Sequence, residues 1–169
     1  MFGLKERLPP VRLEAVHHLV LGRLEPSEKI SYILEGSIGV GGMKIDIRVN
    51  PDGASCESAL SLAANAVSIL PELDASCKLL AAAECLASYN NDWRFGAVAR
   101  PDRSTTAFEK PMLREEQFVE ALSLTGLYAT GTGMLELSYE VGDLFWGHWL
   151  CVTSFDGVAL TDTHVELQG

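Results

Sequence analysis

The chain has 169 residues, of which 47% are hydrophobic and 21% charged, and its formal net charge is −10. This composition is typical of one globular domain and excludes a disordered chain. Because an acidic surface repels phosphate backbones, we expect no nucleic-acid binding. No apolar run is long enough to span a membrane. Four cysteines are scattered within apolar runs, which favours buried free thiols in a cytoplasmic protein.

The first half of the chain predicts an N-terminal arm, three strands and a turn. Residues 1–14 form the arm, because Pro9-Pro10 cannot continue regular structure, and residues 15–169 form a single domain. We expect a first strand over 16–22, in which the adjacent His17 and His18 face opposite sides and cannot share a metal. Alternating apolar residues then predict a hairpin of strands 30–38 and 43–49 around a glycine-rich turn.

Two long helices should follow the turn at 50–53. Ser55 is a suitable N-cap for a helix over 57–70, and Pro71 separates it from an alanine-rich helix over 72–89. Asn90-Asn91 predicts a left-handed C-terminal cap. Residues 94–112 are expected to be a long loop. A short amphipathic helix is predicted over 113–122.

The C-terminal part predicts four strands, at 124–130, 133–141, 149–155 and 158–167. A two-residue turn at Asp156-Gly157 would pair His148 with Val165 and His164 with Trp149. The two histidines would then face opposite sides of the sheet, which disfavours a shared metal site. The expected fold is therefore α+β, a largely antiparallel sheet of about six or seven strands with two long helices and one short helix packed on it.

One stretch, residues 142–149, stands out by its composition: Gly-Asp-Leu-Phe-Trp-Gly-His-Trp. We consider three roles for it. It can seal one end of the core, with His148 a satisfied buried histidine. It can leave aromatic side chains exposed as a binding hot spot. It can also be catalytic, with Asp143 orienting His148 as a general base, helped by Asn90, Asn91 or Asp92.

Three phrases together resemble an uncharacterised bacterial domain of unknown function. They are Leu-Ala-Ser-Tyr-Asn-Asn-Asp-Trp at 86–93, Glu-Glu-Gln-Phe at 115–118, and Tyr-Glu-Val-Gly-Asp-Leu-Phe-Trp-Gly-His at 139–148. The resemblance covers about residues 16–169 and implies a bacterial origin, a cytoplasmic setting and an α+β fold, but no activity. Members of that family tend to have Ser or Thr before the Glu-Glu pair, whereas this chain has Arg114, so the helix cap must come from elsewhere.

The sequence therefore predicts a small cytoplasmic interaction or regulatory module that binds another protein through an aromatic patch near Trp146. The candidate binding residues are Phe145, Trp146, Trp93, Asn91 and Asp92. The acidic chain would suit a basic partner. The alternative is an enzyme of unknown substrate that uses His148 and Asp143. We predict no metal, cofactor, nucleic acid or membrane partner, and the sequence leaves the oligomeric state open, a homodimer included.

Overall fold

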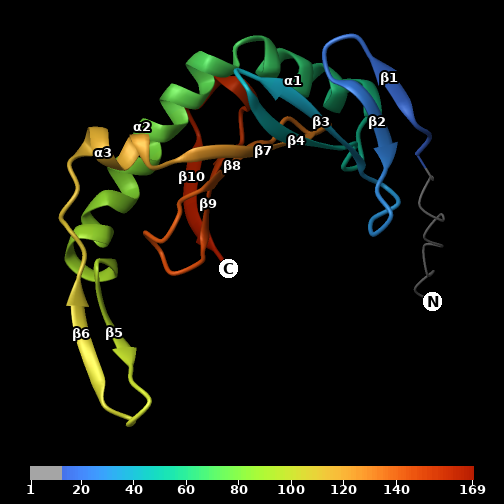
Figure 1. Cartoon of the computed structure of the whole chain (residues 1–169). Helices are drawn as coiled ribbons and strands as arrows, with labels where there is room; N and C mark the ends of the chain where they lie inside the picture. Colours follow the sequence, from blue (N-terminus) through green and yellow to red (C-terminus); the bar gives the residue numbers. More distant parts are fainter. Residues whose placement is uncertain (1–12) are drawn as a thin grey trace, which may run out of the picture.

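A curved sheet of eight strands runs through the computed structural model, which describes residues 13–169 (Figure 1). The predicted N-terminal arm lies, for residues 1–12, outside the described residues. In spatial order the strands are β1 (Val16–His18), β2 (Gly22–Pro26), β3 (Leu34–Val40), β4 (Met43–Asn50), β7 (Ser123–Thr130), β8 (Leu135–Glu140), β9 (Trp149–Ser154) and β10 (Thr163–Gln168).

All neighbouring strands are antiparallel except β4 and β7, which are parallel. Parallel neighbours need a long crossover connection, and here that crossover holds every α-helix of the described chain. The predicted α+β fold with a largely antiparallel sheet is confirmed. The predicted number of six or seven strands is wrong, because the sheet has eight.

The additional strand comes from the segment predicted as one strand over 16–22. It is a tight hairpin, β1–β2, in which the Nδ1 atom of His18 accepts hydrogen bonds from the backbone N–H groups of Val20 and Leu21. Gly22 closes the turn with a φ of +71°, a conformation that glycine adopts at little cost. His17 is exposed and His18 half-buried, as their alternation predicts.

Two long helices, α1 (Cys56–Ser68) and α2 (Leu70–Ser88), cover one face of the sheet, and the short helix α3 (Glu115–Glu120) packs beside α2 (Figure 1). Ser55 caps α1 as predicted, since its side chain accepts a hydrogen bond from the Ser58 backbone. Arg114 precedes α3, and the side-chain oxygen of Gln117 accepts its backbone N–H. This is the cap that the sequence could not locate.

The register between β9 and β10 differs from the prediction by four residues. Asp156-Gly157 does not form a two-residue turn, because a 3-10 turn, η2 (Gly157–Ala159), and a left-handed Leu160 lengthen the connection. The Asp156 carboxylate accepts hydrogen bonds from Ser154 and Thr161 and holds this longer loop. His164 therefore pairs with Thr153. A shift of four keeps the alternation of faces, so His164 and His148 still belong to opposite sides.

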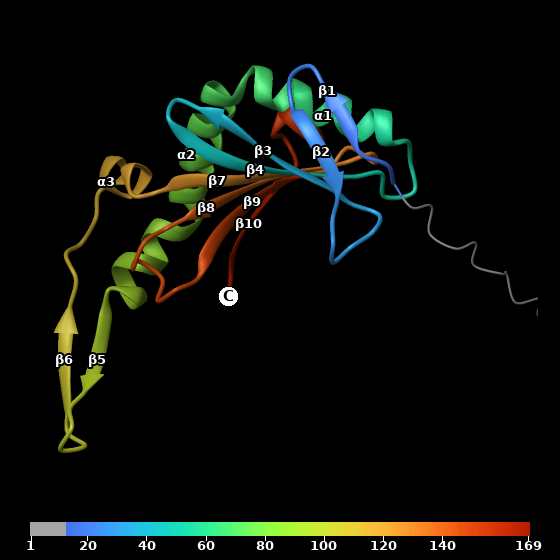
Figure 2. The ribbon, with the colours of Figure 1, turned by 45° about the vertical axis from the view of Figure 1, so that its right-hand side comes forward.

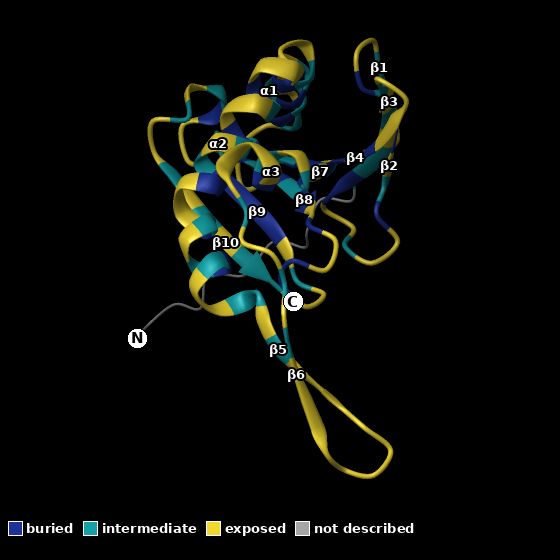
Figure 3. Cartoon of the chain, turned by 60° about the vertical axis from the view of Figure 1, so that its left-hand side comes forward, coloured by how far each residue is buried: buried dark blue, intermediate teal, exposed yellow. Residues whose placement is uncertain are grey.

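Residues 94–112, predicted as a loop, contain a second small sheet. Strands β5 (Phe95–Ala99) and β6 (Thr105–Glu109) form an antiparallel hairpin that projects away from the main sheet (Figure 2). Exposed residues dominate its whole length (Figure 3). The short strands and small side chains weaken the sequence signal for such a hairpin. The turn-favouring residues Pro101-Asp102 are the only strong indication of the hairpin in the sequence.

The core lies between the sheet and α1 and α2, and its buried side chains form one cluster. The opposite face of the sheet carries no helix among residues 13–169 (Figures 1 and 2). Within the described residues no helix is long and apolar enough to cross a membrane. Cys77, Cys85 and Cys151 are buried and Cys56 is half-buried. Burial raises the pKa of the Cys77 thiol to about 12, which keeps it protonated at neutral pH.

The α1 cap gives a first prediction. Replacing Ser55 with Ala removes the side-chain acceptor for the Ser58 backbone N–H, and we expect a loss of about 1 kcal/mol in the free energy of unfolding. Ser55→Asp restores an acceptor and should retain most of the stability. Urea denaturation followed by circular dichroism measures both. Equal midpoints for wild type and Ser55→Ala would contradict the assigned cap.

Candidate functional site

Two phrases about fifty residues apart in the chain meet at the base of the β5–β6 hairpin. The first is the π-helical turn η1 (Tyr89–Trp93), which continues α2. The second is the loop 141–148 between β8 and β9. The predicted left-handed cap at Asn90-Asn91 is wrong, because the backbone of this turn stays helical through Arg94. Such π-turns insert a residue into a helix and often occur at functional sites.

Phe145 is the centre of an aromatic cluster at this junction, and it is fully buried. Its ring meets the rings of Tyr89, Trp93 and Phe118 edge to face, with centroids 6.0, 5.5 and 6.1 Å away. Edge-to-face pairs add to the energy of simple burial. Phe145 thus joins η1, α3 and the loop. It cannot contact a partner itself, and it supports the surface above it.

Trp146 lies beside this cluster but stays 46% exposed. Its φ is +56°, in the left-handed region that disfavours every residue with a Cβ. Its indole N–H donates to the Trp93 carbonyl at 3.0 Å, and its ring packs on Phe108 of β6 with centroids 5.3 Å apart. Only glycine fits at position 96, since a Cβ there would lie 2.3 Å from the Trp146 ring.

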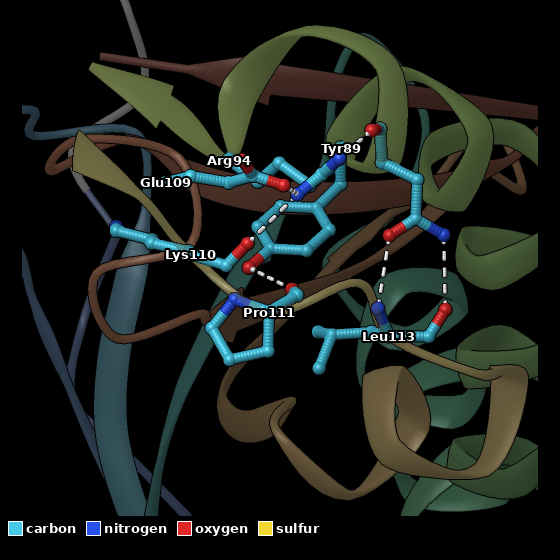
Figure 4. Close-up of polar contacts among 7 residues, drawn as sticks. Tyr89, Arg94, Glu109, Lys110, Pro111 and Leu113 are labelled. Atoms are coloured by element: carbon cyan, nitrogen blue, oxygen red, sulfur yellow. Dashed lines mark hydrogen bonds and ion pairs between the residues drawn. The ribbon is translucent and has the colours of Figure 1, made fainter. Parts of the chain in front are cut away.

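A set of polar contacts fixes both strands of the hairpin to the end of α2 (Figure 4). The Asn90 side chain donates to the Leu113 carbonyl and accepts from the Leu113 N–H, both at 2.9 Å. The Arg94 guanidinium donates to the carbonyls of Asn90 and Lys110 at 2.7 and 3.1 Å and pairs with Glu109. The Tyr89 hydroxyl donates to the Pro111 carbonyl. The hairpin base is therefore rigid.

Tyr89 is kept as a donor by its surroundings. Burial raises the pKa of its hydroxyl, the Asp143 carboxylate raises it further, and the Arg94 guanidinium opposes both. The neutral phenol is the form that can donate to the Pro111 carbonyl. Tyr89 therefore has a structural role as a hydrogen-bond donor and not a role as an acid or base.

Asp143 and His148 do not contact each other by any hydrogen bond within the described residues. The Asp143 carboxylate is 3.1 Å from the Lys110 ammonium and its side chain is 89% exposed. His148 packs on Trp93, and its Nδ1 lies 2.7 Å from the Phe145 carbonyl. A carbonyl can only accept, so Nδ1 carries the proton and Nε2 holds the lone pair of the neutral ring. A backbone carbonyl, and not Asp143, orients His148.

The remaining candidates lie on the surface near Trp146. Asn91 and Asp92 are exposed and Trp93 is half-buried. The carboxylates of Asp143 and Glu109 are also exposed, although the cations that pair with them are largely covered. Asp143 pairs with the Lys110 ammonium that lies over the Trp146 ring, and Asp92 precedes Trp93, whose carbonyl accepts the indole N–H. Glu109 follows Phe108 in β6 and therefore points to the opposite face of the hairpin. We call Trp146, Phe108, Asp92 and Asp143 the Trp146 patch.

Sequence reasoning missed the hairpin side of this patch. Phe108 and Lys110 lie in the segment expected to be a loop, and Lys110 is 4.8 Å from the centroid of the Trp146 ring, a cation–π distance. The spacing of Phe108, Lys110 and Gly96 carries no signal, because their partner is far away in the chain.

Removing the centre of the cluster gives a second prediction. Phe145→Ala leaves a cavity where three rings converge, and we expect a loss of about 3–5 kcal/mol in the free energy of unfolding. Phe155→Ala is the matched control, since Phe155 is 53% exposed and should change stability by about 0.5 kcal/mol or less. Urea titration separates them, and similar midpoints would refute the role assigned to Phe145.

The close contact between Gly96 and the Trp146 ring gives a third prediction. Gly96→Ala forces the Trp146 ring away from Phe108, and we expect a loss of about 1–3 kcal/mol and a changed near-ultraviolet dichroism of tryptophan. Gly39→Ala is the control, because Gly39 is also in a strand but has nothing within 4 Å of an added Cβ. Indistinguishable spectra of the two variants would show that Trp146 does not pack on the hairpin.

Comparison with known families gives one result. Residues 18–164 match the model of a family described as an uncharacterised protein conserved in bacteria, DUF2262. Neither the curated proteins nor the solved structures contain a match to the chain. The matched range contains the whole Trp146 patch and the hairpin that supports it. The chain therefore belongs to the bacterial family DUF2262, and the predicted resemblance to an uncharacterised bacterial domain of unknown function is confirmed.

Proposed function

We propose that this protein is a small cytoplasmic interaction module of bacteria that binds another protein through the Trp146 patch. One observation carries the proposal: a half-exposed tryptophan is held in a left-handed backbone conformation on a rigid base. Tryptophan is enriched among the residues that dominate binding energies at protein interfaces. Backbone strain is retained where the surroundings enforce it, and such positions cluster at functional sites.

The surroundings of Trp146 favour a basic partner. Asp143 and Asp92 offer exposed carboxylates beside the ring, since Asp143 pairs with the Lys110 ammonium over the ring and Asp92 precedes Trp93. An aromatic centre with a charged rim is the usual anatomy of a protein interface. The hydrogen bonds at the hairpin base hold the ring in place before binding, so little conformational entropy is lost when a partner docks.

The alternative, an enzyme with His148 as general base, has less support. Asp143 would have to leave Lys110 before it could orient His148. The packing of Trp93 and Gly169 against the imidazole ring limits the space for a substrate. The free Nε2 lone pair is the feature that keeps this alternative open to test.

Affinity capture with purified bait proteins tests the proposal. We expect proteins retained by wild type and by Phe155→Ala to be lost with Trp146→Ala, while all three baits stay folded, with the same far-ultraviolet dichroism spectrum and a cooperative urea transition. Retention of the same proteins by Trp146→Ala would refute binding at the patch. A His148→Gln bait that loses the interaction while Trp146→Ala keeps it would favour the alternative site.

The nature of the partner is tested by salt. Ion pairs at the rim of an interface weaken as the Debye length shortens. We therefore expect the captured partner to be released as the salt concentration rises, and Asp92→Asn with Asp143→Asn to lower the salt dependence. Binding that is unaffected by salt would contradict a basic partner and leave the aromatic contact as the source of affinity.

A further inference from the structure

The β5–β6 hairpin leaves strand edges and apolar side chains uncovered. Both of its strands have one unpaired edge, and most of its residues are exposed (Figure 3). An isolated two-stranded hairpin is marginal in water, and unpaired strand edges readily pair with other chains. The apolar side chains of Phe95 and Val98 are 44% and 58% exposed. The hairpin base holds these unpaired strand edges and apolar side chains away from the sheet. We read them as a binding surface for another chain.

The charge of the chain is unevenly distributed, and the hairpin has the opposite sign to the rest. Residues 94–110 contain four Lys or Arg and two acidic residues. Residues 115–169 contain nine acidic residues and no Lys or Arg. The chain therefore combines a basic hairpin with a strongly acidic C-terminal third. The two segments have complementary charges, but within one molecule the hairpin points away from the sheet (Figures 1 and 2).

The tip of the hairpin presents its cations outward. Backbone hydrogen bonds from Arg103 to Arg100 and from Arg100 to Ser104 close the turn. The Asp102 carboxylate is occupied by the Ser104 N–H and hydroxyl, which hold the pKa of that carboxyl below its usual value. Among residues 13–169 neither Arg100 nor Arg103 has an ion-pair partner. These two guanidinium groups need carboxylates from elsewhere.

The helix-free face of the sheet offers such carboxylates at β8 and β10. Glu136 and Glu140 alternate with the buried Leu137 and Tyr139 along β8, so they point to that face. Glu166 pairs with Cys151, which alternates with the buried Leu150 in the same way. Figures 1 and 2 show the hairpin projecting to the side of the sheet opposite α1.

We propose that two copies of this chain form a symmetric dimer by exchanging their β5–β6 hairpins, so that Arg100 and Arg103 of each copy lie against the acidic β8–β10 face of the other. A two-fold axis satisfies both hairpins at once and closes the assembly. The dimer uses the hairpin tip and leaves the Trp146 patch at its base to another protein. It therefore does not rest on the proposed function.

A charge-swap experiment on the full-length chain tests the dimer. One variant, Arg100→Glu with Arg103→Glu, reverses the tip, and another, Glu136→Lys with Glu140→Lys and Glu166→Lys, reverses the acidic face. Sedimentation velocity should show a dimer for wild type and a monomer for each variant alone, because like charges then face each other. An equimolar mixture of the two variants should form a heterodimer, because both contacts are complementary again.

Two control variants and a salt titration complete the experiment. Lys29→Glu with Arg114→Glu changes the net charge by the same amount as the tip variant, lies outside the hairpin, and should leave the dimer intact. Asp92→Asn, which changes the Trp146 patch outside the hairpin, should also leave it intact, which separates this proposal from the function of the patch. Higher salt should weaken the wild-type dimer by tenfold or more in dissociation constant.

A wild-type monomer at every concentration would overturn the proposal and assign the hairpin to a different protein. A dimer that survives reversal of the tip would also overturn it, as would a mixture of the two variants that stays monomeric. Loss of the dimer in the Lys29→Glu, Arg114→Glu control would show that total charge, and not the hairpin, controls association.

Discussion

The packing of Phe145 is the contact on which the functional end of this molecule depends. Its ring joins the end of α2, the short helix α3 and the loop between β8 and β9. None of these segments has regular hydrogen bonds to the others as neighbouring strands do, so side-chain burial must position them. Phe145 is buried, and the next residue, Trp146, is exposed and has a left-handed backbone.

The strain at Trp146 and the rigidity of the hairpin base support each other. The indole bond to the Trp93 carbonyl and the packing on Phe108 compensate for an unfavourable backbone conformation. The same contacts hold β6 against the loop. The Asn90 and Arg94 side chains then fix the two strands of the hairpin from the side of α2. A tryptophan used only to seal the core would be more stable fully buried and unstrained. Its exposed position is the feature on which the proposed binding rests.

The sequence predicted the parts of the fold that depend on short-range pattern. Alternation identified the strands of β3–β4 and β8, helical spacing identified α1 and α2, and Ser55 identified a cap. Two of the failures involve turns whose geometry is decided by side chains. His18 turns the chain so that β1 ends there and β2 begins at Gly22, and Asp156 lengthens the β9–β10 connection and shifts its register by four residues. Local propensity does not contain those hydrogen bonds.

The candidate site was likewise only partly predictable from the sequence. The phrase 142–149 was recognisable from its composition, and so was the phrase at 89–93, but only the tertiary structure shows that they pack together beneath a hairpin. The structure gives different environments to the residues on which the three considered roles depend. Phe145 seals the core, Trp146 is exposed, and His148 is oriented by a carbonyl. The net charge of −10 likewise does not give the charge of any one surface of the molecule. The hairpin tip carries Arg100 and Arg103, and the helix-free face carries Glu136, Glu140 and Glu166 at β8 and β10. One copy cannot bring these opposite charges together, because its hairpin projects away from the sheet (Figure 2), whereas a second copy can.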